Sequence, residues 1–416
     1  MPTEKITLKG HIIDSLLLPK VLDEILNSGN SYSILELRVG VHSHDPSFAR
    51  LEIKTPTDEA MVHLLDQLRV HGANPETVQD ATLATADVDG SLPPGFYSST
   101  NLETEVRVNG RWLPVQHPEM DCGIVIEDGG ARTIPMGEVR KGMQVVMSGL
   151  GIRALAIEKP RLDDHPEFEF MSSDISSEKP KSLMIDRVAE QMRDVKAAGK
   201  RIMWVAGPAL VHTGTGPDVC ALIRAGYVDA LFAGNGVAAH DIESHMFGTS
   251  LGVHLDAGIA AEHGHEHHIR AINDVRRHGS FDAAIDAGLF KDGIVYHLVK
   301  HDIDYLFGGS VRDDGPMPET VTDMMEVQTR LRDLIWGRSG DDLVGYCIVV
   351  GTMLHGIATG NCLPASVPLV CVDINQATVT KLMDRGSWQS IGIITDLSLF
   401  VRDLVERLAP EELDRP

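Results

Sequence analysis

The sequence is poor in cysteine and in positive charge, and it lacks a long apolar run. Its five cysteines are an odd number without paired spacing, so neither a disulfide framework nor a zinc knuckle is expected. No apolar stretch approaches the roughly 20 residues of a membrane-spanning helix. The opening MPTEKITLKG also lacks the apolar segment of a signal peptide. We therefore expect a soluble, cytoplasmic protein.

The charge balance is acidic, with 37 Lys and Arg against 60 Asp and Glu and a formal net charge of −23. Such a chain repels nucleic acids and anionic membranes, and no basic stripe offsets the repulsion. With 416 residues, 43% of them hydrophobic, there is room for two or three domains. We predict a small-molecule partner and neither nucleic acid nor membrane.

Residues 1–79 predict a ferredoxin-like α+β module. Strand patterns fall at 5–14, 33–40 and 48–55, and helix patterns at 19–29 and 58–73, with a fourth strand expected near Ala81. The second helix carries apolar residues at helical spacing, and the strand at 33–40 alternates with a period of two; these positions are Met61, Leu64, Leu65 and Leu68, and Leu35, Leu37 and Val39. The module is either a scaffold or a site for a regulator or another subunit.

Residues 80–159 predict a small β domain with no catalytic signature. Asn109-Gly110 between alternating apolar residues predicts a hairpin there. Residues 160–182 are polar and bounded by proline, which is typical of a linker.

Residues 183–416 alternate strands with helices, and their strands are almost continuously apolar. This pattern predicts an α/β domain with a doubly wound parallel sheet covered on both faces. Ligands of such sheets bind beyond the carboxyl ends of the strands. Glycine-rich or polar loops follow predicted strands at 207–216, 234–245 and 351–361, and Asp373 ends another strand.

The segment from Gly351 to Asp373 has the spacing of a dinucleotide site: a strand, a glycine turn, a helix, and a second strand that ends in an acid. Asp373 could accept hydrogen bonds from ribose hydroxyls and would repel a 2′-phosphate, which favours NAD over NADP. GTMLHG is not GxGxxG, so an ordinary strand-to-helix connection is the alternative at this turn.

Long motifs of the C-terminal region resemble the family that carries the conserved domain of the bifunctional lysine-oxoglutarate reductase/saccharopine dehydrogenase (LOR/SDH). The motifs include VAGPALVHTGTG, AGNGVAAHDIE, GGSVRDDGPMPE and GTMLHGIATGNCLPA. The resemblance implies an archaeal-type, NAD-dependent ornithine cyclodeaminase. Such an enzyme converts L-ornithine to L-proline and ammonia through transient oxidation at Cα, cyclisation of the imine and re-reduction.

A more distant resemblance is to deoxyhypusine synthase, whose NAD-binding segments run in the same order. It implies a Rossmann variant of that enzyme's type, although the lysine nucleophile has no counterpart in DRGSWQSIG. Carried over by motif, it assigns NAD contacts to Asn235, Gly236, Val237, Asp314, Gly351, Thr352, Met353, Leu354, His355, Asp373, Asp396 and Leu397.

The implied reaction needs a base for the amine, a negative group for the δ-ammonium and a cation for the carboxylate. Asp241 and Glu243 are candidates on the amine side, and helix capping is the alternative for both. His212 and His355 lie in the glycine-rich loops, where an imidazole could transfer a proton near neutral pH. Arg312 is a candidate for the carboxylate, with a surface ion pair as its alternative.

Four histidines crowd the run EHGHEHHIRAIND, and His263 and His267 have the i, i+4 spacing of a ligand pair. No further ligands are evident, so no metal is predicted; a polar helix face or a lining on the substrate side is the alternative. Two other functions remain open: a saccharopine- or lysine-type dehydrogenase with net NADH formation, and a non-catalytic amino-acid sensor. We expect a homo-oligomer, either a dimer or a tetramer.

Overall fold

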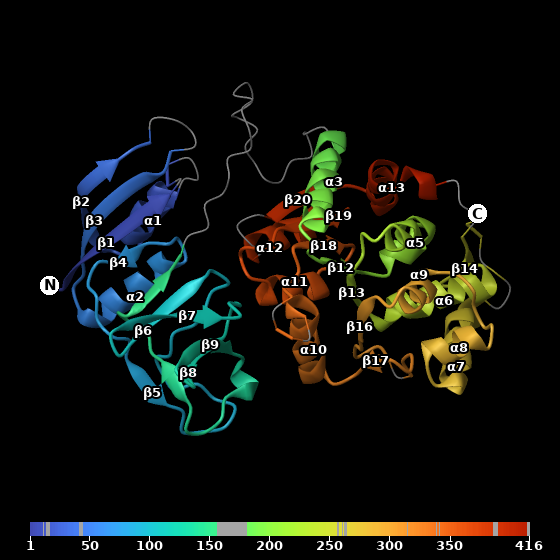
Figure 1. The fold of residues 1–416 in the computed structure, drawn as a ribbon, viewed down its shortest axis with the longest axis horizontal. Helices are drawn as coiled ribbons and strands as arrows, with labels where there is room; N and C mark the ends of the chain where they lie inside the picture. The colour runs from blue at the N-terminus through green and yellow to red at the C-terminus, as the bar shows by residue number, and fades with distance from the viewer. Residues whose placement is uncertain are drawn as a thin grey trace. The chain divides into compact units, whose positions relative to one another are not determined.

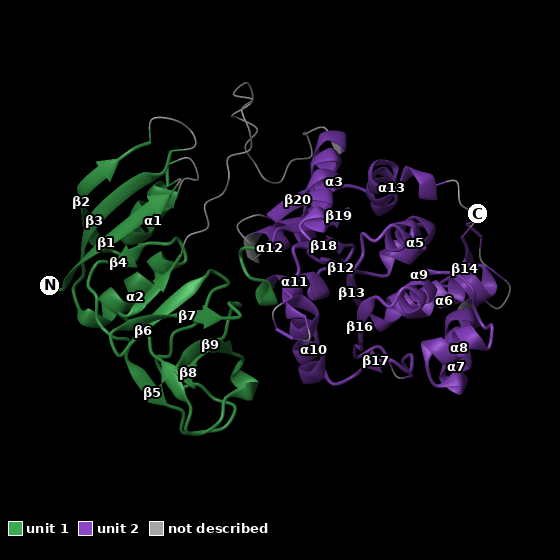
Figure 2. Ribbon diagram, in the orientation of Figure 1, with its two compact units in different colours: residues 1–167, 361–366 green, residues 168–360, 367–416 purple. Residues whose placement is uncertain are grey.

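The computed structural model divides the chain into two compact units (Figure 2), which are described separately. One comprises Met1–Glu167 with Asn361–Ser366, and the other comprises Phe168–Gly360 with Val367–Pro416. The structure describes residues 1–10, 12–13, 17–40, 45–155, 181–255, 258–259, 261, 264–313, 315–337, 339–340, 342–385 and 390–413.

The chain begins with a β-α-β-β-α-β module (Figure 1): β1 (Thr3–Gly10), α1 (Leu17–Asn27), β2 (Ser31–Arg38), β3 (Ser47–Lys54), α2 (Asp58–Arg69) and β4 (Asn74–Pro75). The strands pair antiparallel in the order β2-β3-β1-β4, which confirms the ferredoxin-like prediction. Helix α2 begins where the Thr57 side chain accepts from the Ala60 N–H. It buries Met61, Leu64, Leu65 and Leu68, as their spacing predicts.

The prediction of a fourth strand near Ala81 is wrong. The fourth strand is the short β4, whose Pro75 has no N–H to continue a ladder. The side chain of Asn74 bonds the N–H and the carbonyl of Ala154 instead, at 2.9 and 2.7 Å. The strand that follows Ala81 belongs to the next sheet.

That second sheet has the order β11-β6-β7-β9-β8-β10-β5 among the described residues. Its strands are β5 (Leu83–Thr85), β6 (Thr104–Val108), β7 (Arg111–Gln116), β8 (Gly123–Glu127), β9 (Gly130–Ile134), β10 (Gln144–Val146) and β11 (Ile152–Ala154). Asn109 and Gly110 take φ values of 50° and 78° between β6 and β7, as the predicted hairpin turn requires.

The second unit is built on a parallel sheet of order β17-β16-β13-β12-β18-β19-β20. Its strands are β12 (Ile202–Ala206), β13 (Ala230–Gly234), β16 (Asp304–Gly308), β17 (Thr320–Val321), β18 (Tyr346–Val350), β19 (Leu369–Asp373) and β20 (Ser390–Ile394). Every residue of the central strands β12 and β18 is buried, as the apolar runs predict.

Helices cover both faces of this sheet, which confirms the doubly wound prediction. The longer ones are α3 (Lys181–Ala197), α5 (Gly216–Arg224), α6 (Asn235–Phe247), α7 (His267–His278), α9 (Ile294–Lys300), α10 (Met324–Trp336), α11 (Leu354–Cys362), α12 (Gln376–Arg385) and α13 (Leu397–Leu408). On one face, Trp204 joins the buried cluster formed with α3, α5 and α13. On the other face, Val349 lies against Gly356 of α11.

The strand order reverses between β12 and β18. From β12 the chain runs outward through β13, β16 and β17, whereas from β18 it runs the opposite way through β19 and β20. The loops that follow β12 and β18 therefore lie at the switch point of the sheet, on its carboxyl edge, which is where parallel sheets bind their ligands.

Candidate active site at the switch point of the parallel sheet

The two glycine turns at the switch point touch each other. The N–H of Gly207 donates to the carbonyl of Val350 at 2.9 Å. A Cβ on Gly207 would lie 1.9 Å from the carbonyl oxygen of Gly351, so only glycine fits there. Gly351 itself has φ +60°, and a Cβ on it would meet Leu397 at 2.8 Å. The three predicted segments that contain Gly207, Gly351 and Leu397 thus contact one another at the switch point.

His355 joins the loop after β18 to the end of β13. Its ring packs edge-on against Phe232 with centroids 4.8 Å apart, and its Nδ1 lies 3.3 Å from the hydroxyl of Thr352. A Cβ on Gly234 would come within 3.3 Å of the ring, so that glycine makes room for it. Burial lowers the pKa of His355, which keeps the ring neutral at pH 7.

Asn235 opens α6 and holds the loop that contains the DDG motif. Its Oδ1 accepts from the N–H of Met317 and the hydroxyl of Thr320, both at 2.9 Å, and its Nδ2 donates to Asp313 at 3.0 Å. These bonds occupy Oδ1 and one N–H of Nδ2, so Asn235 can offer a ligand its backbone and the second N–H of Nδ2. The helix start has no side-chain cap, since Gly234 is the N-cap residue. Such a start suits a phosphate.

The acidic strand ends lie beyond β19 and β20. Asp373 is the last residue of β19 and accepts from the N–H of Asn375 at 2.8 Å. Asp396 caps α13 by accepting from the hydroxyl and the N–H of Ser398, and these two bonds lower the pKa of its carboxyl. The carboxylates of Asp373 and Asp396 thus each accept from a neighbouring residue, and each has further lone pairs that could accept from a ligand.

A carboxylate–imidazole pair, Glu243 with His240, lies on α6. Glu243 is fully buried, and its Oε2 lies 2.9 Å from Nδ1 of His240. The hydroxyl of Thr249 and the N–H of Gly252 both donate to Oε1 at 2.9 Å. Burial by itself would raise the pKa of Glu243, but the bonds from His240, Gly252 and Thr249 together hold that pKa below its usual value. Glu243 is therefore a carboxylate.

His212 lies beside this pair. Its ring centroid is 4.8 Å from that of His240, and its Nδ1 is 2.7 Å from the hydroxyl of Ser250, in the hairpin of β14 (Thr249–Ser250) and β15 (Val253–His254). Burial, then the neighbouring His240, lowers the pKa of His212. Glu243 bonds the backbone of the same hairpin. It thus fixes the hairpin as well as the imidazole.

Two histidines from the predicted histidine run join this group. Nδ1 of His267 lies 2.9 Å from the hydroxyl of Thr249, and its ring stacks on Phe247 at 4.7 Å. The ring of His268 is 6.2 Å from that of His240. His263 lies outside the described residues, and so does the metal pair that its spacing suggests.

Asp241 points the other way, into the protein. Its Oδ1 accepts from the N–H of Ile294 at 3.0 Å, and its Oδ2 accepts from that of Val295 at 2.8 Å. Both oxygens thus bond the first turn of α9. Burial raises the pKa of Asp241, and His245 and the two N–H groups oppose that rise. This geometry corresponds to the capping alternative, with the cap on a neighbouring helix.

The other residues predicted to contact NAD, and Arg312, make no side-chain contact that identifies a role among the described residues. Gly236 packs near the ring of Pro208, and the Val237 side chain is buried, so both could offer only backbone. Met353 and Leu354 are exposed at the start of α11, and Arg312 is exposed. Asp314 lies outside the described residues.

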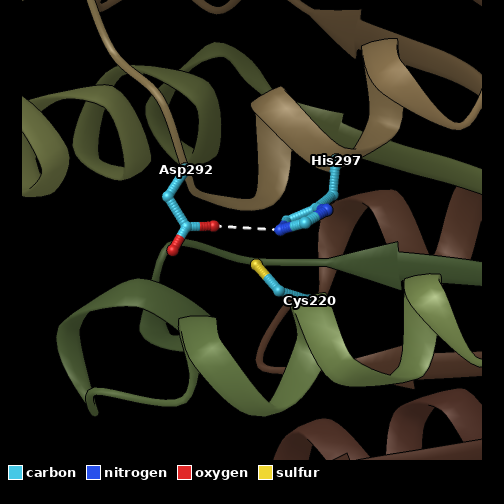
Figure 3. A group of neighbouring side chains, drawn as sticks. All are labelled: Cys220, Asp292 and His297. Atoms are coloured by element: carbon cyan, nitrogen blue, oxygen red, sulfur yellow. Dashed lines mark hydrogen bonds and ion pairs between the residues drawn. The ribbon is translucent and has the colours of Figure 1, made fainter. Parts of the chain in front are cut away.

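Elsewhere in the second unit, three residues of metal-ligand types meet among the described residues (Figure 3). The ligand atoms of Cys220, Asp292 and His297 lie within 4.8 Å of one another. However, Arg224 Nη1 lies 3.3 Å from Nε2 of His297, the atom that Asp292 also contacts at 2.9 Å. Burial raises the pKa of Cys220 well above its usual value. A guanidinium and a protonated thiol oppose a bound cation, so we assign no metal here.

No described helix has both the length and the apolar character needed to cross a bilayer. Three family models match successive parts of the chain. Residues 3–102 match the LOR/SDH bifunctional enzyme conserved region. Residues 103–185 match the first region, and residues 186–404 the Rossmann fold, of the C-terminal part of ArgZ-like arginine dihydrolases.

A relative from Methanothermobacter thermautotrophicus, named ornithine cyclodeaminase, is 44% identical over 98% of both chains. The apo crystal structure of ArgZ, an arginine dihydrolase from the ornithine-ammonia cycle in cyanobacteria, superposes with a TM-score of 0.84 at 34% identity. It covers all of this chain, which spans 59% of ArgZ. The ternary complex of AgrE with ornithine and NAD+ is 36% identical with a TM-score of 0.52; it covers 99% of this chain, which spans 58% of AgrE.

Proposed function

The chain belongs to the family of the archaeal ornithine cyclodeaminases and the C-terminal part of ArgZ-like proteins, and on that premise we propose that it is an NAD-dependent ornithine cyclodeaminase. It would convert L-ornithine to L-proline and ammonia. The convergence of both glycine turns with the start of α6, next to the Glu243–His240 pair, carries this proposal.

The switch point fits NAD. Its features are an uncapped helix start at Gly234, glycines 207 and 351 that bring the two loops together, and Asp373 at the end of the adjacent strand. We propose that the α6 start holds phosphate and that Asp373 holds ribose hydroxyls. NAD+, when bound, supplies a hydride acceptor that returns the hydride within the same turnover, so no net redox change results.

His240 is the proposed base, a role that the sequence motifs did not single out. Because the Glu243 carboxylate faces Nδ1 and can only accept, it would hold a proton on that atom and leave Nε2 of His240 to act on the substrate through its lone pair. A substrate ammonium must lose a proton before its carbon can be oxidised, and this lone pair would accept it. The signal in the sequence is the spacing of three residues between His240 and Glu243 on one helix face.

We propose supporting roles for the other predicted catalytic residues. His212, with its pKa lowered and its ring beside His240, would receive or return the second proton. His355 would fix the wall of the pocket at Gly234. Glu243 would orient His240 and the β14–β15 hairpin, and Asp241 would anchor α9.

The direct test is turnover of purified protein with L-ornithine and NAD+. We expect ammonia and proline in equal amounts with no build-up of NADH. NADH equimolar with product would instead identify an amino-acid dehydrogenase, and binding of ornithine without ammonia would identify a sensor. Lysine and saccharopine in the same assay separate these outcomes.

We further propose a cytoplasmic location, consistent with the burial of all five cysteines, and assembly as a homo-oligomer. We also propose that the ferredoxin-like module ends at residue 79, the small β domain at residue 159 and the linker at residue 182. The likeness to deoxyhypusine synthase remains a prediction from the motifs.

A further inference from the structure

Strand β2 presents an apolar edge without a partner strand in the described part of the chain. It is the terminal strand of the order β2-β3-β1-β4, so one side of its backbone has no ladder. Ile34, Leu35, Leu37 and Val39, in and just beyond this strand, expose 44–57% of their surface. Natural edge strands are normally protected by charge, proline, a β-bulge or shortness; β2 has a bulge and two charged residues, yet its apolar side chains remain exposed. An eight-residue edge with this apolar content favours pairing with another strand.

A β-bulge in β2 explains why these side chains gather there. The register with β3 shifts between Ile34 and Glu36, which places Leu37 opposite the buried Ala49 and Glu36 opposite Arg50. Beyond the bulge, apolar residues lie on the face that the helices cover, and charged residues lie on the open face. Leu37 and Val39 continue the apolar face past the helices, where they remain exposed.

The order of charges around Leu37 is self-complementary. If a second β2 runs antiparallel about an axis through Leu37, Glu36 faces Arg38 of the other copy, and Leu35 faces Val39. An axis moved by one residue in either direction sets Glu36 against Glu36 or Arg38 against Arg38, and both pairs repel. An axis that falls between two residues sets apolar side chains against charged ones. Of these registers, only the one centred on Leu37 sets Glu36 against Arg38 and Leu35 against Val39.

We propose that β2 pairs with β2 of a second copy of this chain, antiparallel and centred on Leu37, so that the two N-terminal sheets form one continuous sheet. This interface is independent of the proposed catalytic function. It would give the N-terminal module a role in assembly.

A cysteine introduced at position 37 tests the register directly. The two-fold axis brings position 37 opposite its own copy, at the Cβ separation of about 4.5–5.5 Å of facing residues, close to that of a disulfide. Under mild oxidation, Leu37→Cys should give a covalent dimer on a non-reducing gel. The five native cysteines are buried and give little background. The matched control is Val39→Cys, whose two copies lie about 13 Å apart in this register. No cross-link from Leu37→Cys, or equal cross-linking from both variants, overturns the proposal.

A charged variant tests the interface without a cross-linking reaction. Leu37→Lys places two ammonium groups on the axis and should halve the mass measured by light scattering at micromolar concentration. Leu399→Lys, at an exposed site in α13, should leave the mass unchanged. Thermal unfolding confirms that both variants fold. A folded Leu37→Lys protein with the parent mass, or a monomeric parent protein, contradicts the pairing.

Discussion

Glu243 Oε2 lies 2.9 Å from Nδ1 of His240. The same carboxylate also accepts from the N–H groups of Leu251 and Gly252, in the turn of the β14–β15 hairpin. One buried acid thus sets both the tautomer of an imidazole and the position of the loop beside it. Coupling of this kind makes Glu243 a positioning residue whose loss shows in the rate constant and in the pH profile.

Glu243→Gln should lower kcat by about 10- to 100-fold, because the amide no longer stabilises the charged imidazole or fixes its tautomer. The pH profile of the rate should also change, since the Glu243 carboxylate, whose pKa is held below its usual value, is replaced by a neutral amide. Glu326→Gln, at an exposed ion pair with Arg330, is the control and should leave both unchanged. A parent-like pH profile in Glu243→Gln would count against the base assignment.

Asp241→Asn should lower the free energy of unfolding by about 1–3 kcal/mol, because its NH2 group would face the N–H of either Ile294 or Val295 and leave that donor without an acceptor. Urea denaturation measures the change, and Asp282→Asn on the surface of α8 (Phe281–Asp286) is the control. If the variant keeps its stability but loses turnover, Asp241 acts on the substrate and not on α9.

Gly207→Ala should weaken NAD binding and lower stability by about 1–3 kcal/mol, since a methyl group 1.9 Å from the Gly351 carbonyl forces the two turns apart. Calorimetric titration with NAD+ measures the affinity. Gly360→Ala, where the methyl group meets open space in α11, should be neutral or stabilising. If Gly207→Ala binds NAD+ as tightly as the parent protein, the two glycine turns do not form part of the cofactor site.

Asp373→Asn should raise the Kd for NAD+ about tenfold, equivalent to about 1.4 kcal/mol, because a charged acceptor for ribose hydroxyls is lost. Affinity for NADP+ should change less, which narrows the preference between the two cofactors. Asp403→Asn on α13 serves as the control. Equal binding of NAD+ by parent and variant would refute the ribose assignment.

Stability should fall as the pH drops below about 6.5. Burial lowers the pKa of His355 and of His212 in the folded state, so the unfolded chain takes up protons first. The stability of the neutral rings is therefore present above pH 6.5 and lost below it. His355→Gln should flatten this slope in denaturation series across pH, whereas the exposed His278→Gln should not. If the free energy of unfolding depends on pH in His355→Gln as it does in the parent protein, His355 does not contribute to the loss of stability at low pH.

Local pattern determined much of the architecture. The helical spacing from Met61 to Leu68, the Asn109-Gly110 turn and the apolar strands at 202–206 and 346–350 each specify their element through nearest-neighbour chemistry. Period and turn type are properties of short segments, so the sequence carries them without the fold. The glycine turn and the acid at the end of β19 could be recognised for the same reason.

Tertiary structure alone decided the partners of side chains that meet across long separations. Asp241 and Glu243 are two residues apart on α6 and look alike in the sequence, yet α6 turns one toward α9 and the other toward His240. Helix rotation of about 100° per residue sends them to different neighbours. Contacts between Gly207 and Gly351 likewise depend on strand order, because only the pairing of β12 with β18 brings their turns together.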